Sequence, residues 1–75
     1  MKISWKKSKG VLTGTVNTVK YGEVTVSVKK SVQGMNYEAR FMQNTVIGRR
    51  GYVEDAKQLC IDYLEGLNLE VIGES

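Results

Sequence analysis

Residues 53–67, VEDAKQLCIDYLEGL, are the only segment of the chain whose apolar spacing predicts a helix. At about 100° per residue, the apolar side chains fall on one stripe and the acidic and amide side chains lie opposite. The stripe consists of Val53, Ala56, Leu59, Cys60, Tyr63, Leu64 and Leu67. A helix with one apolar side needs a surface to cover, and the residues before it predict strands. We therefore expect the helix to lie on a sheet.

The segments before the helix alternate apolar and polar residues with the period of a strand. The predicted strands are residues 11–20, 23–30 and 35–43, with an edge strand in residues 2–9. Gly14 interrupts the first of these and predicts a bulge or a close crossing by the helix. The predicted fold class is α+β, an antiparallel three- to four-stranded meander packed against one C-terminal helix. A short last strand is expected in residues 68–72, NLEVI.

Residues 44–51, NTVIGRRG, are predicted to form a loop that leads into the helix. Gly51 can act as the N-cap, and Glu54 can reach back to it as in a capping box. Gly66 is expected to end the helix in a left-handed conformation. Two glycines, two arginines and a helix N-terminus would then meet at one place, which suits phosphate. The alternative is that the arginines pair with Glu54 or Asp55 nearby.

Length and composition limit the organisation of the chain. Its 75 residues predict one domain, residues 1–75, with a single-layer core. The single cysteine, Cys60, cannot form an internal disulfide, which is typical of a reducing compartment, so we expect a cytoplasmic location. No apolar run approaches the roughly 20 residues of a membrane span, and MKISWKKSKG has no apolar segment of a secretion signal. No membrane association is expected.

Charge divides the chain near Gly51. The net charge is +3, yet residues 1–50 carry ten basic groups against two acidic ones, and residues 51–75 carry one basic group against six acidic ones. If the helix covers one face of the sheet, the molecule has a basic side and an acidic side.

Catalysis is not expected. The chain has no histidine, which removes the usual general base and the commonest zinc ligand. Cys60 lies within the apolar stripe, where a thiol behaves as a small hydrophobe. The acids Asp55, Asp62 and Glu65 lie on the outward side of the helix and are expected to be solvated charges. No glycine pattern matches a nucleotide-binding loop, so no catalytic residue, metal ligand or cofactor is predicted.

Polyanion binding is the leading functional hypothesis. Outward strand positions and the predicted loop carry the basic residues that we expect to contact phosphates: Lys6, Lys7, Lys9, Lys29, Arg40, Arg49 and Arg50. Sheets that bind nucleic acid present such a face. The alternative is that these charges only keep the free face soluble and protect its edges.

Other side chains bear on the choice of partner. Trp5 and Tyr21 could stack on bases beside the lysines, although a lone tryptophan in a small domain more often belongs to the core. Met42 falls on the face that should be solvated and, with Val46 and Ile47, predicts a small exposed apolar patch. Such a patch favours a protein partner.

The order of elements resembles a class of small phage or prophage accessory proteins. The resemblance rests on Trp5, the valine-rich strands, Tyr37 and the phrase YVEDAK (residues 52–57) that opens the helix. The layout is also similar to AP2-type DNA-binding domains and to the arm-binding domain of tyrosine integrases, whose sheet enters the major groove. Here the outward positions of the middle strand carry Thr25 and Ser27, where the integrase-like pattern has basic residues.

Two functions are therefore expected. The first is a small nucleic-acid-binding module that contacts the phosphate backbone. The second, implied by the resemblance to phage proteins, including some anti-CRISPR proteins, is an inhibitor or accessory protein that docks on a host protein. A homodimer formed through edge strands fits either function.

Overall fold

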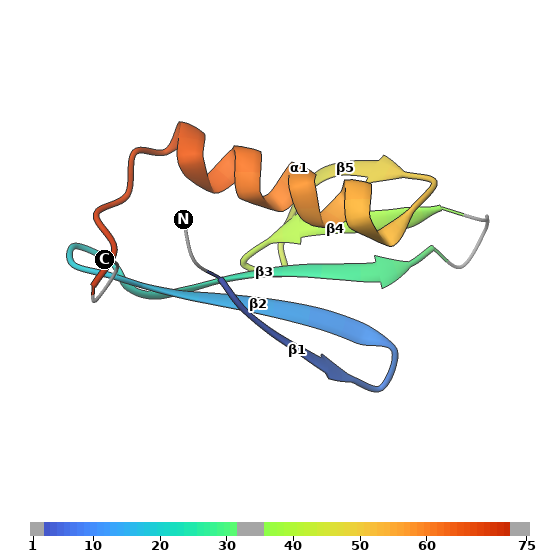
Figure 1. The fold of residues 1–75 in the computed structure, drawn as a ribbon, viewed down its shortest axis with the longest axis horizontal. Helices are drawn as coiled ribbons and strands as arrows, with labels where there is room; N and C mark the ends of the chain where they lie inside the picture. The colour runs from blue at the N-terminus through green and yellow to red at the C-terminus, as the bar shows by residue number, and fades with distance from the viewer. Residues whose placement is uncertain (1–2, 32–35, 73–75) are drawn as a thin grey trace.

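The computed structural model describes residues 3–31 and 36–72. It shows one antiparallel sheet in the order β1-β2-β3-β4-β5 and one helix lying across one face (Figure 1). The elements are β1 (Ser4–Ser8), β2 (Val11–Thr18), β3 (Gly22–Lys30), β4 (Tyr37–Phe41), β5 (Thr45–Arg50) and α1 (Val53–Gly66). The α+β meander with a C-terminal helix is confirmed. Between residues 23–30 and 35–43 the sequence also predicts a turn around Gln33–Gly34, and this turn lies outside the described residues.

The sheet has five strands, so the predicted three to four was too few. The additional strand is β5, which covers most of the segment that was expected to be a loop. A bulge between Ala39 and Arg40 shifts its register against β4 and obscures the alternation in the sequence. Gly48 gives the helix room there, because a Cβ atom would lie in tight contact, 3.2 Å from Cδ1 of Leu59. The glycine that suggested a loop instead lets the helix approach β5.

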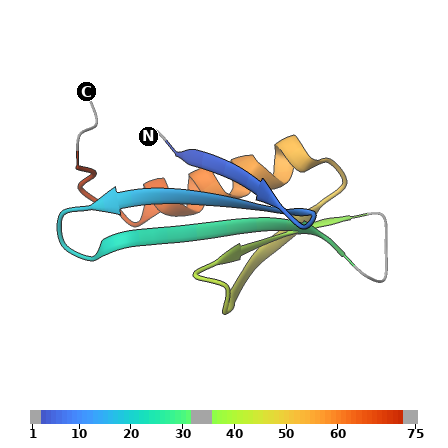
Figure 2. The ribbon, with the colours of Figure 1, turned by 90° about the horizontal axis from the view of Figure 1, so that it is seen from below.

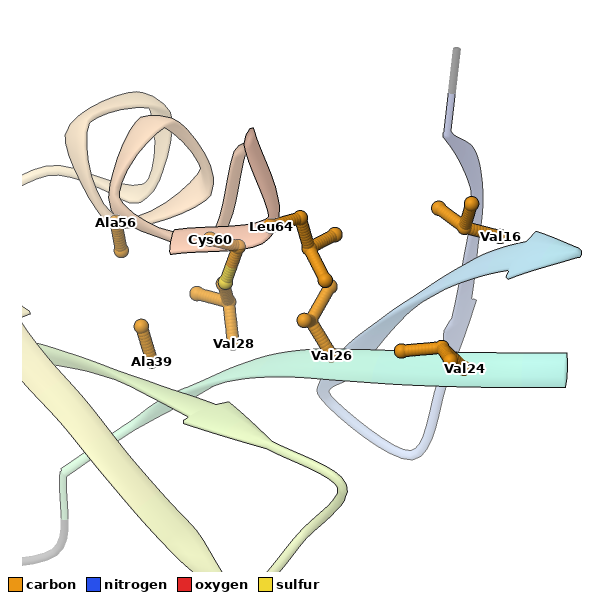
Figure 3. Close-up of a cluster of buried hydrophobic side chains, with 8 residues drawn as sticks. All are labelled: Val16, Val24, Val26, Val28, Ala39, Ala56, Cys60 and Leu64. Carbon is orange, nitrogen blue, oxygen red and sulfur yellow. The ribbon is translucent and has the colours of Figure 1, made fainter. Parts of the chain in front are cut away.

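The core lies between α1 and the covered face of β3, β4 and β5 (Figure 3). Ala56, Cys60 and Leu64 of the predicted stripe are fully buried against valines of β3 and Ala39 of β4. Val53, Leu59 and Tyr63 are partly buried, whereas Leu67 is exposed. Small side chains at Ala39 and Ala56 let the two layers approach closely. The helical periodicity thus identified the covering side correctly.

β1 and β2 extend the sheet beyond the helix. Gly14 permits this arrangement, because a Cβ atom there would lie 2.7 Å from Cγ2 of Ile3 and 3.0 Å from the Trp5 ring. The close approach to Gly14 that was expected from the helix is instead made by Trp5 of β1 and by Ile3, the residue before β1. Trp5 is partly buried against the core, and the Lys57 ammonium lies 5.2 Å from its ring centre.

Both predicted helix caps are wrong. Tyr52 is the N-cap, and no side chain caps the first turn, where Glu54 and Asp55 supply negative charge instead. At the other end the C-cap is Leu67, which is right-handed, and the left-handed residue is Asn68 (φ 54°). The helix therefore continues through Gly66.

The predicted last strand is reduced to a single bridge. Val71 pairs with Thr18 at the end of β2, supported by backbone hydrogen bonds from Val19 to Glu70 and from Ile72 to Asn17. Leu69 and Val71 pack against the core cluster. Within the described residues, no helix is long and apolar enough to cross a membrane.

Candidate nucleic-acid interface

Strand pairing gathers the basic residues at one end of the sheet. β1, β3 and β5 run in the same direction, so their last residues lie at the same end, where α1 begins (Figure 1). This basic end holds Lys6, Lys7, Lys9, Lys29, Lys30, Arg40, Arg49 and Arg50, together with the acids Glu38, Glu54 and Asp55. All seven predicted site residues are included. Lys30 was not among the predicted site residues, and the alternation of β3 places it on the covered side.

Four of the seven predicted residues lie on the face opposite the helix, here called the open face (Figure 2). One cross-strand row there runs Ser8, Val11, Lys29, Glu38, Arg49, and the next runs Lys6, Thr13, Ser27, Arg40, Val46. Lys6, Lys29, Arg40 and Arg49 therefore share the open face. Lys7 and Arg50 alternate to the helix side, and Lys9 lies in the β1–β2 turn.

The expected convergence of Arg49 and Arg50 before the helix is therefore not found. In a strand, successive side chains point to opposite faces, so β5 separates the two guanidinium groups. The alternative pairing with Glu54 or Asp55 is also wrong for Arg49, which pairs with Glu38. Nη1 of Arg50 donates to the carbonyl oxygen of Arg49 at 2.7 Å.

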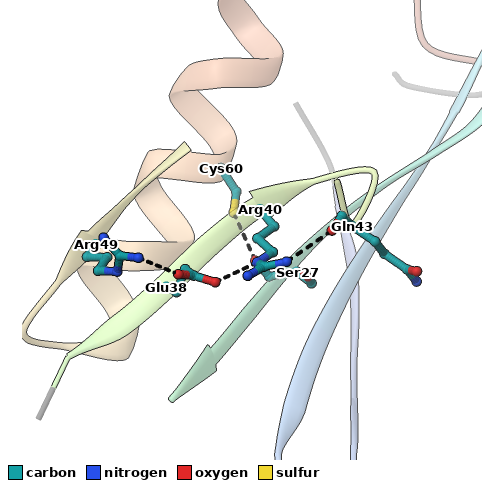
Figure 4. A network of polar contacts seen from close by, with 6 residues as sticks. All are labelled: Ser27, Glu38, Arg40, Gln43, Arg49 and Cys60. Atoms are coloured by element: carbon teal, nitrogen blue, oxygen red, sulfur yellow. Dashed lines mark hydrogen bonds and ion pairs between the residues drawn. The ribbon is translucent and has the colours of Figure 1, made fainter. Parts of the chain in front are cut away.

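Glu38 lies at the centre of the basic residues of the open face and is only 6% exposed, because arginines cover it (Figure 4). Nε of Arg40 donates to one carboxylate oxygen, and Nη2 of Arg49 donates to the other at 2.9 Å. Nη1 of Arg40 also donates to the Gln43 carbonyl oxygen at 3.3 Å. The hydrogen bond from Arg40, opposed by partial burial, lowers the pKa of Glu38 below its ordinary value. Glu38 thus fixes both arginines and neutralises part of their charge.

A polar depression of about 220 Å³ lies beside this network on the open face. Its lining residues are Val11, Thr13, Ser27, Lys29, Arg40 and Gln43. Ammonium, guanidinium and hydroxyl groups are the usual donors to phosphate oxygens in nucleic-acid complexes. Of the two hydroxyl residues, Ser27 was noted in the sequence as a departure from the basic pattern of integrase-like sheets. The register places Thr13 of β2 and Ser27 of β3 between Lys6 of β1 and Arg40 of β4 in one cross-strand row.

No protein-family model, curated protein or solved structure matches this chain.

The aromatic side chains do not join the basic open face. Trp5 lies on the covered side of β1, packed on Gly14, as its interpretation as a core residue predicted. Tyr21 is 63% exposed but lies in the β2–β3 turn, at the end of the sheet away from the basic end. Neither ring is placed to stack on a base held beside Lys29 and Arg40.

The expected apolar patch is only partly formed. Met42 and Val46 are exposed, whereas Ile47 is partly buried against the core. The sulfur of Met42 accepts a hydrogen bond from the backbone N–H of Thr25 at 3.3 Å, which holds Met42 against the first half of β3.

The Cys60 thiol is fully buried, and burial raises its pKa from 9.0 to about 11. Its sulfur lies 3.9 Å from the Ser27 carbonyl oxygen, so it packs between helix and sheet (Figure 4). Within residues 3–31 and 36–72, no group of three or more cysteine or acidic side chains could hold a metal ion.

The native thiol is therefore expected to resist modification. At pH 8, where an exposed cysteine reacts readily as its thiolate, Cys60 should react with an aromatic disulfide reagent at least about a hundredfold more slowly than after denaturation. Absorbance of the released thiolate measures both rates. Fast reaction in the native protein would show that the helix does not stay on the sheet.

Proposed function

We propose that the protein is a small non-enzymatic module that binds the phosphate backbone of a nucleic acid on the open face of its sheet, at the basic end. The main support is the polar depression, where Lys29, Arg40, Thr13 and Ser27 bring cations and hydroxyl donors together. A single buried free cysteine suits an intracellular, reducing location for such a module.

The distribution of charge favours binding over solubility as the role of these residues. Charges that only keep a sheet soluble can be spread along its strands, whereas the pairing register gathers these at one end. Lys20 is the one basic residue of the described β2–β3 turn at the other end. Gathered cations release counterions from a nucleic acid, which is the main driving force of backbone binding.

Little base specificity is proposed. The open face offers its cations and hydroxyls to phosphate oxygens, and the aromatic rings of Trp5 and Tyr21 lie elsewhere. Phosphate contacts position a protein on a nucleic acid but do not read its sequence. We therefore expect DNA and RNA of unrelated sequence to bind with similar affinity.

Fluorescence anisotropy of labelled oligonucleotides at a series of salt concentrations tests the proposal. Each phosphate contact contributes about 0.7 to 0.9 to the slope of log K against log salt, so two to four contacts predict a slope between about −1.4 and −3.6. Lys29→Gln should weaken binding several-fold and reduce the magnitude of the slope by about one. Absence of binding to single- and double-stranded DNA and RNA at low salt would disprove the proposal.

Lys20→Gln provides the matched control, because it removes the same charge from an exposed residue at the other end of the sheet. It should change the affinity by less than about twofold. Equal effects of Lys29→Gln and Lys20→Gln would mean that net charge alone attracts the nucleic acid, without an interface at the basic end.

A phage-type accessory protein that docks on a host protein is the second candidate. The exposed Met42 and Val46 favour it, because apolar side chains on an otherwise polar face suit a protein partner. A complex recovered from host lysate should then survive nuclease treatment and be lost in Val46→Asp. Loss of the partner on nuclease treatment would instead support binding to nucleic acid.

A further inference from the structure

An apolar hollow lies at the end of the molecule opposite the basic end. β3 starts at Gly22, yet its first residue paired with β4 is Val26, opposite Phe41, so the start of β3 extends beyond the neighbouring strand. The chain after the helix crosses this gap and leaves a hollow of about 380 Å³. The lining residues are Tyr21, Val24, Phe41, Met42, Leu67 and Leu69, with Glu23 among them. Neither the fold nor the proposed nucleic-acid interface uses it.

The polar character of the hollow is acidic. Glu23 is the one charged residue among the described lining residues of the hollow itself, and the adjoining depression is lined by both Glu70 and Lys20. Its volume falls within the range of about 300 to 1,000 Å³ that is usual for binding pockets. An apolar group accompanied by positive charge would therefore fit it.

The basic end of the same chain carries such a group. Tyr52 is 74% exposed, the highest value among the large hydrophobic side chains of the described residues. It directly follows Arg49, Arg50 and Gly51 in the chain. As the helix N-cap it has a fixed backbone, because its carbonyl oxygen accepts the first helical hydrogen bond, from Ala56 at 3.1 Å. A pre-positioned aromatic ring loses little conformational entropy on binding.

We propose that Tyr52 of one molecule inserts into the apolar hollow of a second copy, with Arg50, which lies on the helix side of β5, approaching Glu23. The ring lies where α1 begins and the hollow where α1 ends, toward opposite ends of the longest dimension, 37 Å (Figure 1). Such a contact joins different surfaces of the two copies, so it is heterologous and leaves a free ring and a free hollow at the ends. Association is then head-to-tail and does not stop at a dimer.

Sedimentation velocity of the purified full chain at low salt and without nucleic acid tests this inference separately from the proposed function. The average mass of the 8.4 kDa protein should rise with concentration, without a plateau at the dimer, and should fall as salt is added. Tyr52→Ser and Leu67→Arg should each weaken self-association by about tenfold or more. Both positions are exposed, and circular dichroism confirms that the variants fold.

Mixing the two variants gives the decisive measurement. Tyr52→Ser retains the hollow, and Leu67→Arg retains the ring, so together they can form one intact contact. The mixture should form a one-to-one complex that neither variant forms alone. A mixture of Tyr52→Ser with Glu23→Lys, which also alters the hollow and retains the ring, should form the same complex. A wild-type protein that stays monomeric up to about millimolar concentration, or a mixture without complex formation, would disprove the inference. A plateau at the dimer that both variants retain would show pairing through edge strands instead.

Discussion

Truncation of Leu64 to alanine is expected to lower the free energy of unfolding by about 2 to 5 kcal/mol. Leu64 is fully buried and is among the largest buried side chains of the core, where it points from the helix toward Val26 of β3 (Figure 3). A chain of this length has a total stability of roughly 4 to 11 kcal/mol, so one such cavity removes a large part of it. Urea unfolding followed by circular dichroism gives the difference.

Leu67→Ala is the control for this prediction. It deletes the same atoms at the next turn of the helix, but Leu67 is 43% exposed. We expect it to cost less than about 1 kcal/mol. Equal losses of unfolding free energy in the two variants would mean that the helix does not pack on the sheet with the side that carries Ala56, Cys60 and Leu64.

Replacement of Glu38 by glutamine is expected to raise the affinity for nucleic acid about three- to tenfold at low salt. The carboxylate accepts hydrogen bonds from Arg40 and Arg49 and offsets their charge in the centre of the open face. The amide keeps the shape of the side chain and removes the negative charge, and its single oxygen can accept from one of the two guanidinium groups while the other is released. Anisotropy titrations like those proposed for Lys29→Gln measure the change.

Glu65→Gln is the matched control, because it alters net charge equally on the exposed side of the helix near its C-terminal end. It should change the affinity by less than about twofold. Weaker binding by Glu38→Gln would contradict the prediction and show that the ion pairs orient the arginines for their contacts.

Acid titration of stability reports on the same carboxylate. The pKa of Glu38 in the folded state lies below its ordinary value of 4.5, so its interactions contribute stability above that pH. This contribution is lost as the pH falls through the lowered pKa of the folded state. Glu38→Gln should therefore lose less stability than the wild type between neutral pH and the acid range. Parallel curves would show that the two ion pairs do not stabilise the fold.

Local patterns were sufficient for most elements. Alternation along residues 23–30 and the stripe of the helix depend on backbone geometry that each segment adopts by itself. Both the buried valines and the covering side of α1 were correctly derived from them. β5 was missed because a bulge breaks its alternation and Gly48 resembles a loop residue. Only contact with Leu59 of the helix explains that glycine.

The sequence by itself determined the α+β class, the apolar side of the helix and the excess of positive charge before Gly51. Tertiary structure alone decided which cations share a surface. Pairing register joins residues far apart in the chain, and it places Arg49 against Glu38 while β5 sends Arg50 to the other face. Such pairing depends on the whole sheet, because a shift of one residue would move each of these side chains to the opposite face.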